Sequence, residues 1–180
     1  MRNLIKISVV IPTYNRHYLL KKTVNSWYKV NSFTKFEYEI IFSDDGSTDD
    51  SVNFLRSIKN LPIIILENEH GGASAARNAA MKAARGERIL FFGDDIFPDP
   101  QVLNIHWTKS LLFGSNHAIL GQVDWHPKLN VNHLMKHITE LGNEQFSYNR
   151  LKPGSLTDYR HFYTCNISIP KNLLKKEKNN

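Results

Sequence analysis

Residues 7–15 read Ile-Ser-Val-Val-Ile-Pro-Thr-Tyr-Asn, an apolar and largely β-branched run that gives way to a proline and polar side chains. The first five residues are typical of a buried strand, which we expect Pro12 to end. Apolar residues then recur at helical spacing from Leu19 to Tyr28, so an amphipathic helix should follow. A strand followed at once by a helix is the repeating unit of α/β folds.

The same alternation continues along the chain. Further strands are predicted over residues 38–42, 63–66 and 89–92, and further helices over residues 52–58, 73–84 and 99–111. The last of these helices should begin with Asp99 as its N-cap and Pro100 at its first position. Continuous apolar strands between helices predict a mostly parallel sheet with helices on both faces and right-handed crossovers.

Beyond residue 115 the pattern is less regular. We expect a strand over residues 117–122, an amphipathic helix over 131–141, a loop over 143–158 and another strand over 163–169. The basic residues 171–180 are expected to form a frayed tail.

The composition predicts one globular domain, since 41% of the 180 residues are hydrophobic and 22% are charged. The net charge is +6, and half of that excess lies in the last ten residues. The remaining chain is only mildly basic, which argues against a dedicated nucleic-acid surface and leaves an anionic small molecule open as a ligand. The single cysteine, Cys165, excludes an intrachain disulfide and a multi-cysteine metal site.

No apolar run approaches the length of a membrane span, and none near the N-terminus resembles a signal peptide. We therefore expect a cytoplasmic protein, with peripheral association at the inner face of the membrane left open.

Ligands of open α/β sheets bind at the carboxyl ends of the strands, so the residues that follow each strand are the candidate site. Asp94 and Asp95 follow the strand over 89–92 and offer the hard oxygen ligands that Mg²⁺ or Mn²⁺ prefers. A solvated turn that leads to Asp99 is the alternative.

The acidic residues after the strand over 38–42 could bind a ligand, cap the next helix, or do both. Asp44 and Asp45 could accept a hydrogen bond from a nucleobase N–H, while residues 47–50 would cap the next helix.

Arg77 lies early in the alanine-rich helix that follows Gly71 and Gly72, where a pyrophosphate would be favoured. An alanine-rich helix packed on the sheet, with Arg77 at the surface, is the alternative.

Several other functional motifs are absent or incomplete in this sequence. His70-Gly71-Gly72 resembles an esterase oxyanion loop, but the chain has no G-x-S-x-G elbow. Neither G-x-G-x-x-G nor G-x-x-x-x-G-K is present, which excludes the dinucleotide-binding and P-loop fingerprints. His133 and His137 are spaced as a zinc pair but lack an evident third ligand.

Four stretches resemble motifs of the family 2 glycosyltransferases, which are inverting enzymes with the GT-A fold, and they follow one another in the family's order: residues 9–15, 41–49, 72–87 and 91–98. Weaker similarity continues through residues 121–127 and 163–170. The resemblance implies a GT-A domain over residues 1–170, with the donor half in 1–100 and a partial acceptor half in 101–170. It also implies a nucleotide-diphosphate sugar donor (a UDP-sugar by preference), a saccharide or other hydroxyl acceptor, Mn²⁺ or Mg²⁺, and a role in polysaccharide biosynthesis.

The resemblance assigns a role to each matching residue. Pro12, Thr13 and Tyr14 would flank the base, Asp45 would accept its N–H with Asp44 beside it, Arg77 would face the diphosphate or base, Asp94 would lie near the ribose, and Asp95 would bind the metal. The family's D-x-D motif has Gly93 in its first position here.

Inversion requires a carboxylate base to deprotonate the acceptor hydroxyl. In the family this base follows the strand that resembles residues 163–169, and no such acidic motif occurs before Asn180. We therefore expect a truncated or partial catalytic domain, with Asp124 and Asp158 as weak candidates for the base. The alternative function is a nucleotide-sugar-binding module without turnover. A sugar nucleotidyltransferase would need a G-x-G-T-R loop after the first strand, which is absent.

Overall fold

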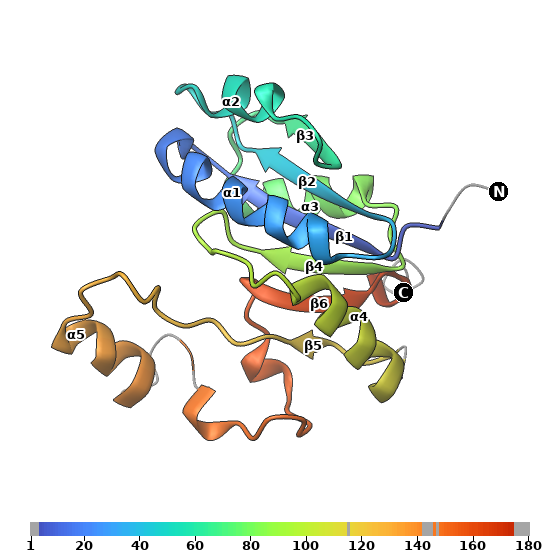
Figure 1. Ribbon diagram of the computed structural model, residues 1–180, viewed down its shortest axis with the longest axis vertical. Coiled ribbons are helices and arrows are strands. Elements are labelled where there is room, and N and C mark those ends of the chain that lie inside the picture. Colours follow the sequence, from blue (N-terminus) through green and yellow to red (C-terminus); the bar gives the residue numbers. More distant parts are fainter. Residues whose placement is uncertain (1–3, 115, 142–145, 147, 175–180) are drawn as a thin grey trace.

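The computed structural model describes residues 4–114, 116–141, 146 and 148–174. Six strands form one sheet in the order β3-β2-β1-β4-β6-β5 (Figure 1). The strands are β1 (Ile7–Thr13), β2 (Tyr38–Asp44), β3 (Ile63–Glu67), β4 (Arg88–Phe92), β5 (Ile119–Leu120) and β6 (Asn166–Pro170). The first four strands run parallel, whereas β6 is antiparallel to both of its neighbours. The predicted α/β fold with a mostly parallel sheet is confirmed.

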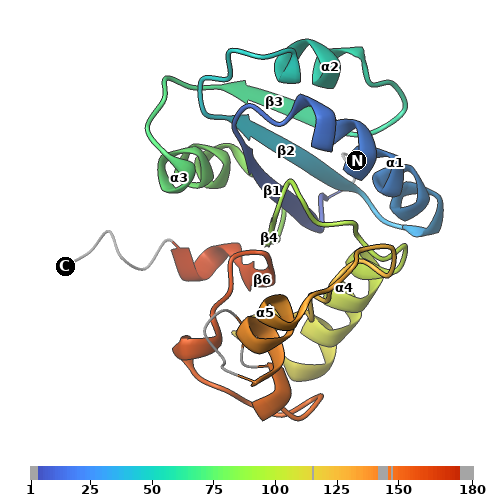
Figure 2. The same cartoon turned by 90° about the vertical axis from the view of Figure 1, so that its left-hand side faces the viewer.

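Helices cover both faces of the sheet, as predicted. The helices are α1 (His17–Phe33), α2 (Ser51–Ser57), α3 (Ala73–Ala83), α4 (Val102–Phe113) and α5 (His133–Lys136). Buried residues of α1, α2 and α4 share one core with the sheet, and those of α3 share a second core with its other face. Figure 2 shows α3 and α1 on opposite sides of the strands. None of the helices in the described ranges is both long and apolar enough to cross a membrane.

The two cores are built from side chains of different size. On the α1 side, the rings of Trp27 and Phe92 meet edge to face with centroids 5.3 Å apart, and both side chains are fully buried. On the α3 side, Ala80 and Ala84 pack against Val10 and neighbouring strand residues. Small side chains let α3 lie close to the sheet, which accounts for the alanine-rich sequence.

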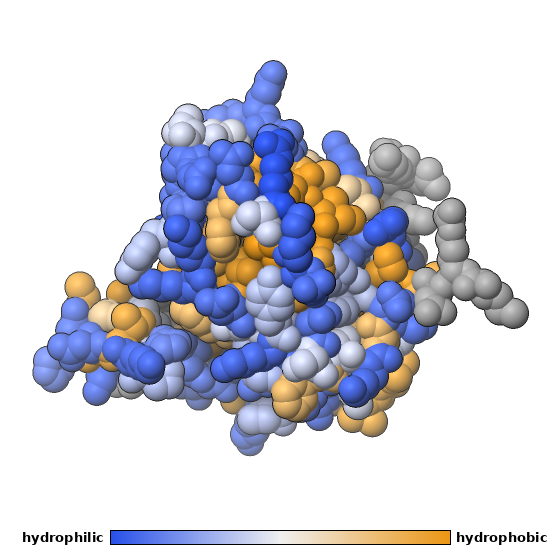
Figure 3. Space-filling view, turned by 45° about the horizontal axis from the view of Figure 1, so that its top comes forward, coloured by the Kyte–Doolittle hydropathy of each residue, from blue (hydrophilic) through white to orange (hydrophobic). Residues whose placement is uncertain are grey.

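The edge of the sheet at β3 is less covered than its centre. Four of the five residues of β3 are half-buried and Glu67 is exposed, whereas all seven residues of β2 are buried. Figure 3 brings the end of the molecule that carries α2 and β3 forward and shows an apolar patch bordered by hydrophilic side chains. Partial exposure of an edge strand follows from its having a neighbour on one side only.

Several predicted boundaries were wrong. β1 continues through Pro12 to Thr13, because its pairing with β4 ends at Val10 and the missing N–H of Pro12 faces no ladder on that side. α4 begins at Val102 rather than after Asp99. The carboxylate of Asp99 accepts the N–H of Gln101, so it caps a preceding turn.

The second half of the chain departs further from the prediction. Only Ile119–Leu120 of residues 117–122 form a strand, and β6 begins at Asn166 rather than at residue 163. The predicted helix over 131–141 consists of one α-helical turn followed by the π-helical segment His137–Leu141. Short 3₁₀ turns, Tyr148–Arg150 and Tyr159–His161, interrupt the remainder. Most of the tail predicted to be frayed, residues 175–180, lies outside the described residues.

A buried carboxylate joins β1, β2 and the segment that follows α3. Glu39 is almost fully buried and accepts hydrogen bonds from the hydroxyl of Ser8 at 2.6 Å and from the main chain and guanidinium of Arg85 at 2.7–2.8 Å. Burial alone would raise the pKa of Glu39, but the hydrogen bonds from Ser8 and Arg85 and the charge of Arg85 outweigh it and lower the pKa. Folding therefore favours the ionised form of this carboxyl group.

Arg85→Ala should lower the free energy of unfolding by about 1–3 kcal/mol, because it removes two charge-assisted bonds from a buried carboxylate. Arg56 forms an ion pair with the exposed carboxylate of Glu67, so Arg56→Ala is a matched control expected to cost less than about 1 kcal/mol. Urea denaturation at pH 7 measures both.

The lowered pKa of Glu39 also sets the direction of the pH dependence. Its contribution to stability is complete above the pKa of the unfolded state and is lost as the pH falls through the folded-state pKa. Equal losses for Arg85→Ala and Arg56→Ala would show that Glu39 does not depend on Arg85.

Candidate functional site

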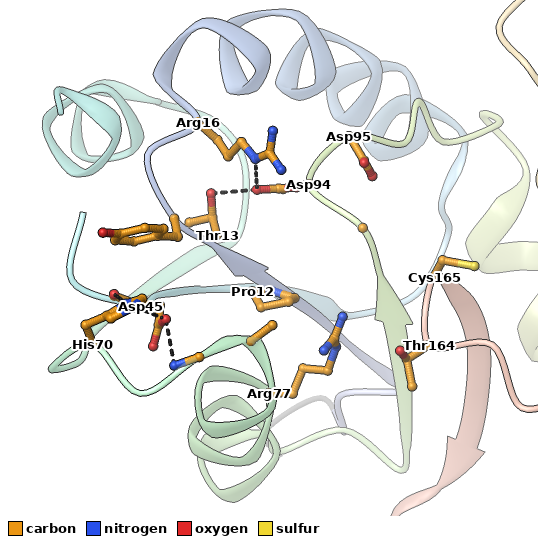
Figure 4. Close-up of a pocket in the computed structure, with 14 residues that line it drawn as sticks. Pro12, Thr13, Arg16, Asp45, His70, Arg77, Asp94, Asp95, Thr164 and Cys165 are labelled. Carbon is orange, nitrogen blue, oxygen red and sulfur yellow. Dashed lines mark hydrogen bonds and ion pairs between the residues drawn. The ribbon is translucent and has the colours of Figure 1, made fainter. Parts of the chain in front are cut away.

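A cleft of about 400 Å³ opens at the carboxyl ends of β1, β2 and β4 (Figure 4). Its lining comes from the ends of these strands, from the loop before α3 and the start of that helix, and from the residues before β6. The lining residues are Pro12, Thr13, Tyr14, Arg16, Asp45, His70, Gly72, Ala73, Arg77, Gly93, Asp94, Asp95, Thr164 and Cys165. Seven of the eight residues that the resemblance places at the donor and metal therefore lie together, and Asp44 is the exception.

The end of β1 supplies one wall of the cleft. Asn15 has a φ of 52°, and its side-chain oxygen accepts the main-chain N–H groups of Thr48 and Asp49. These bonds turn the chain sharply after β1. Tyr14, just before the turn, keeps 42% of its surface exposed at the cleft.

Asp44 and Asp45 are adjacent, but their carboxylates have different hydrogen-bond partners. The carboxylate of Asp44 accepts hydrogen bonds from the main-chain N–H and the hydroxyl of Ser47, so it holds the turn after β2. Asp44 is buried and does not line the cleft, in contrast to the expectation that it would be left for a ligand. Asp45 lines the cleft and accepts the N–H groups of Gly71 at 3.0 Å and Gly72 at 2.9 Å.

Of residues 47–50, which were predicted to cap the helix after β2, Asp50 lies at the N-cap position without a side-chain cap bond, and Asp49 makes the contact with the first turn. Ser47 is engaged by Asp44, and neither Ser47 nor Thr48 caps α2. One carboxylate oxygen of Asp49 accepts the N–H of Ser51 and the other accepts the N–H of His17. The acidic cluster thus ties the start of α1 to the start of α2.

Asp94 and Asp95 follow β4 and differ in exposure. Asp94 accepts a hydrogen bond from the hydroxyl of Thr13 at 2.9 Å and lies 3.8 Å from Nε of Arg16. Burial raises the pKa of Asp94, and the neighbouring charge of Asp95 adds to this, while Thr13 and Arg16 act against it. Asp95 is exposed and lines the cleft. A cation in the cleft would stabilise both carboxylates.

Arg77 is the one cation that α3 contributes to the cleft lining. Its Nε is buried and has no hydrogen-bond partner among the described residues. Figure 4 shows the guanidinium pointing from α3 into the cleft, toward Thr164 and the end of β4. A buried donor without a partner costs free energy, so an acceptor bound in the cleft would relieve that cost.

Seven of the fourteen lining residues were not assigned to the site from the sequence: the small residues Gly72, Ala73 and Gly93, and the polar residues Arg16, His70, Thr164 and Cys165. Arg16 and His70 lie within or next to strand-end segments that were singled out, but neither was assigned to the site. Thr164 and Cys165 were missed because they reach the cleft only through the pairing of β6 with β4, far along the chain. Burial raises the pKa of the Cys165 thiol.

The remaining candidates lie outside the cleft lining. Asp124 accepts two hydrogen bonds from Gln122, and Asp158 is held by the main chain and guanidinium of Arg160, which lowers its pKa to about 2. Within the described ranges, no group of three or more histidine, cysteine, aspartate and glutamate side chains could hold a metal ion. This leaves the His133 and His137 pair without a third ligand.

Comparison with known proteins extends these observations. The family model described as "Glycosyl transferase family 2" matches residues 8–174. This chain belongs to glycosyl transferase family 2. The match covers the four parallel strands and β6, so the family's pattern includes the residues beyond position 115 as well as the cleft.

Two curated relatives illustrate the similarity of this family member. The poly(ribitol-phosphate) β-N-acetylglucosaminyltransferase TarS of Staphylococcus aureus is 35% identical over 103 residues, which are 56% of this chain and 18% of TarS. The UDP-Glc:α-D-GlcNAc-diphosphoundecaprenol β-1,3-glucosyltransferase WfaP of Escherichia coli is 34% identical over 143 residues, which are 73% of this chain and 56% of WfaP. The chain thus spans only part of the length of these relatives.

A solved structure shows the same fold. Residues 1–349 of S. aureus TarS in complex with UDP-GlcNAc superpose with a TM-score of 0.73 at 24% identity, covering 96% of this chain and 47% of that chain. The family 2 sequence is therefore matched by a structure of the GT-A type over nearly the whole chain.

The raised pKa of Cys165 predicts slow modification of its thiol. At pH 8, Ellman's reagent should react with the folded protein more slowly than with the same chain in 6 M urea, because the thiolate is the reactive form and burial disfavours it. Absorbance at 412 nm follows the reaction of this single cysteine. Equal rates in both conditions would show that the thiol is not shielded.

Proposed function

We propose that the cleft binds the nucleoside diphosphate portion of a nucleotide-sugar donor, and that the protein transfers the sugar to a hydroxyl acceptor with inversion. One observation carries this proposal: Arg77, whose buried Nε has no hydrogen-bond partner among the described residues, points its guanidinium into the same cleft that holds Asp45 and the pair Asp94 and Asp95. A diphosphate would supply the anion for Arg77, and a base would supply an N–H for Asp45. The carboxylates after β4 would hold a divalent cation, whose charge would balance the acidic pair.

The donor class follows from the family and its members. WfaP is named for UDP-Glc, and the TarS structure contains UDP-GlcNAc, so we extend a uridine diphosphate sugar to this chain. The acceptors in the two relatives' names, poly(ribitol-phosphate) and a diphosphoundecaprenol-linked sugar, share hydroxyl groups on large anionic molecules. We therefore propose a saccharide or another hydroxyl-bearing molecule as the acceptor. A polyprenol-linked acceptor would place the protein at a membrane surface.

The carboxylates fit a divalent ion of the Mg²⁺ or Mn²⁺ kind. Such ions bind through one or two carboxylates and complete their shell with phosphate oxygens and water, so no three-ligand protein site is needed. Asp95 is exposed at the cleft and would be the ligand, while Asp94 is fixed by Thr13 beside it. When bound, the ion would neutralise charge on the departing diphosphate.

The chain's own residues would hold and orient the donor. Asp45 would accept the base N–H while Pro12, Thr13 and Tyr14 flank the base. Arg77 would bind the diphosphate and stabilise the charge that it gains as the sugar departs. Asp94 would lie next to the ribose. These groups account for donor binding and departure of the leaving group.

The base that deprotonates the acceptor is not among these groups. The carboxylates that line the cleft, Asp45, Asp94 and Asp95, all lie on the donor side, and Asp124 and Asp158 lie outside the lining. Because no described carboxylate outside these three lines the cleft, a nucleotide-sugar-binding module without turnover is the second candidate function. The two functions can be separated by measuring the release of UDP from UDP-sugars with and without saccharide acceptors. A transferase releases more UDP when the acceptor is present, whereas a binding module does not.

UDP should bind in a metal-dependent manner. Isothermal titration calorimetry with Mn²⁺ should give a dissociation constant at least about tenfold lower than with EDTA, because the ion neutralises the diphosphate. Asp95→Asn should remove most of this difference and leave the thermal unfolding midpoint unchanged, since Asp95 is exposed. Equal binding in EDTA would refute the role of the metal.

Arg77→Met should weaken UDP binding by about tenfold or more, because it removes a charge-assisted contact while keeping the length of the side chain. Lys82→Met provides a matched control, since Lys82 is an exposed cation in the last turn of the same helix. The proposal predicts unchanged affinity for the control. Similar losses in both variants would mean that only the general charge of α3 matters.

A further inference from the structure

The imidazole ring of His70 makes two specific contacts in the cleft. Its ring is stacked on that of Tyr14, with centroids 4.5 Å apart and planes 29° apart. Its Nδ1 lies 2.9 Å from a carboxylate oxygen of Asp45 and 3.0 Å from the main-chain oxygen of the same residue. Both partners are acceptors, so Nδ1 carries a hydrogen and donates it to Asp45.

These two contacts are the ones that the proposed function assigns to the base of the nucleotide. A nucleobase is also a planar ring, and it would lie beside Tyr14 and donate an N–H to the carboxylate of Asp45. We propose that His70 is an internal competitor of the nucleobase: its ring occupies the base subsite, and the nucleotide binds by displacing it. The inference rests on the proposed function and goes beyond it by naming what the donor must first displace.

The main chain holds His70 in this position. Gly46 has a φ of +79°, and a Cβ atom added there would lie 3.1 Å from the main-chain N and 3.4 Å from the Cβ of His70. The absence of a side chain at Gly46 therefore allows His70 to pack against the turn after β2. A larger residue would be strained at this φ and would require His70 to shift by a few tenths of an ångström.

Hydrogen bonds anchor the chain on both sides of His70. On one side the N–H of Asn68 donates to the main-chain oxygen of Asp44, and on the other the N–H groups of Gly71 and Gly72 donate to the carboxylate of Asp45. The loop cannot withdraw without breaking these bonds. The His70 side chain is 61% exposed, so rotation about its own side-chain bonds is the available route out of the subsite.

Asp45 can accept the base once the histidine has left. One carboxylate oxygen accepts Gly72 and His70, and the other accepts Gly71. Each carboxylate oxygen can accept two hydrogen bonds, so the oxygen shared by Gly72 and His70 is filled. Departure of His70 frees the acceptor position on this oxygen that lies next to Tyr14, while both glycine amides still hold the carboxylate in place. The same amides keep Asp45 oriented whether the histidine or the base is bound.

Competition of this kind lowers the apparent affinity by the fraction of time that the subsite is open. Removing the competitor should therefore tighten binding. His70→Ala is expected to lower the dissociation constant for UDP, measured by calorimetry with Mn²⁺ present, by about three- to tenfold. His70→Phe keeps a ring that can stack on Tyr14 but cannot donate to Asp45, so its affinity should lie between those of the wild type and His70→Ala.

His133→Ala is the matched control, because His133 is exposed on α5 and does not line the cleft. Its affinity for UDP should equal that of the wild type. A second measurement follows the histidine itself: the ring-proton signals of His70 in the NMR spectrum should move when UDP saturates the wild-type protein, because the stack on Tyr14 is lost.

The outcomes separate this inference from the proposed function. Weaker or unchanged UDP binding by His70→Ala would overturn the competition, as would His70 ring signals that stay in place at saturating UDP. Absence of UDP binding in every variant, the wild type included, would instead overturn the nucleotide site itself.

Discussion

The buried carboxylate of Asp45 is the group on which the shape of the cleft depends. A carboxylate with 4% of its side-chain surface exposed is stable only if donors surround it, and the donors here are two consecutive main-chain amides, Gly71 and Gly72, together with the imidazole of His70. These bonds fix the end of β2 to the N-terminus of α3. The direction of α3, and with it the position of Arg77 one turn later, follows from this connection.

The four parallel strands and the cleft residues that follow them could be predicted from the sequence because their determinants are local. The strand from Ile7 and the helix that contains Trp27 each show a period that identifies the element, and parallel pairing then brings the residues after β1, β2 and β4 to one edge. The individual role of Asp44 could not be predicted in the same way. Both Asp44 and Asp45 follow β2, and only the turn geometry shows that Ser47 uses the first of them.

The second half of the chain could be predicted only in outline. β6 is an antiparallel strand whose position next to β4 depends on contacts between residues about 80 positions apart. Its interior is polar for a buried strand: His106 of α4 is hydrogen-bonded to Ser168 and Asn166, and burial lowers the pKa of His106 to about 4. Ser168 also accepts the guanidinium of buried Arg88. Hydrophobic periodicity gives no sign of such a polar network, which explains the misplaced start of this strand.

The position of β6 within the sheet bears on how the polypeptide assembles during its synthesis. β6 lies between β4 and β5 and is not an edge strand, although the residues that form it are made about 75 positions after β4. Until they leave the ribosome, one side of β4 has main-chain groups without a partner, and an unpaired strand edge invites association with other chains. The parallel part of the sheet in this family 2 chain therefore has an interval in its biogenesis when its central strands need protection, and the same late strand that ends this interval also delivers Thr164 and Cys165 to the cleft.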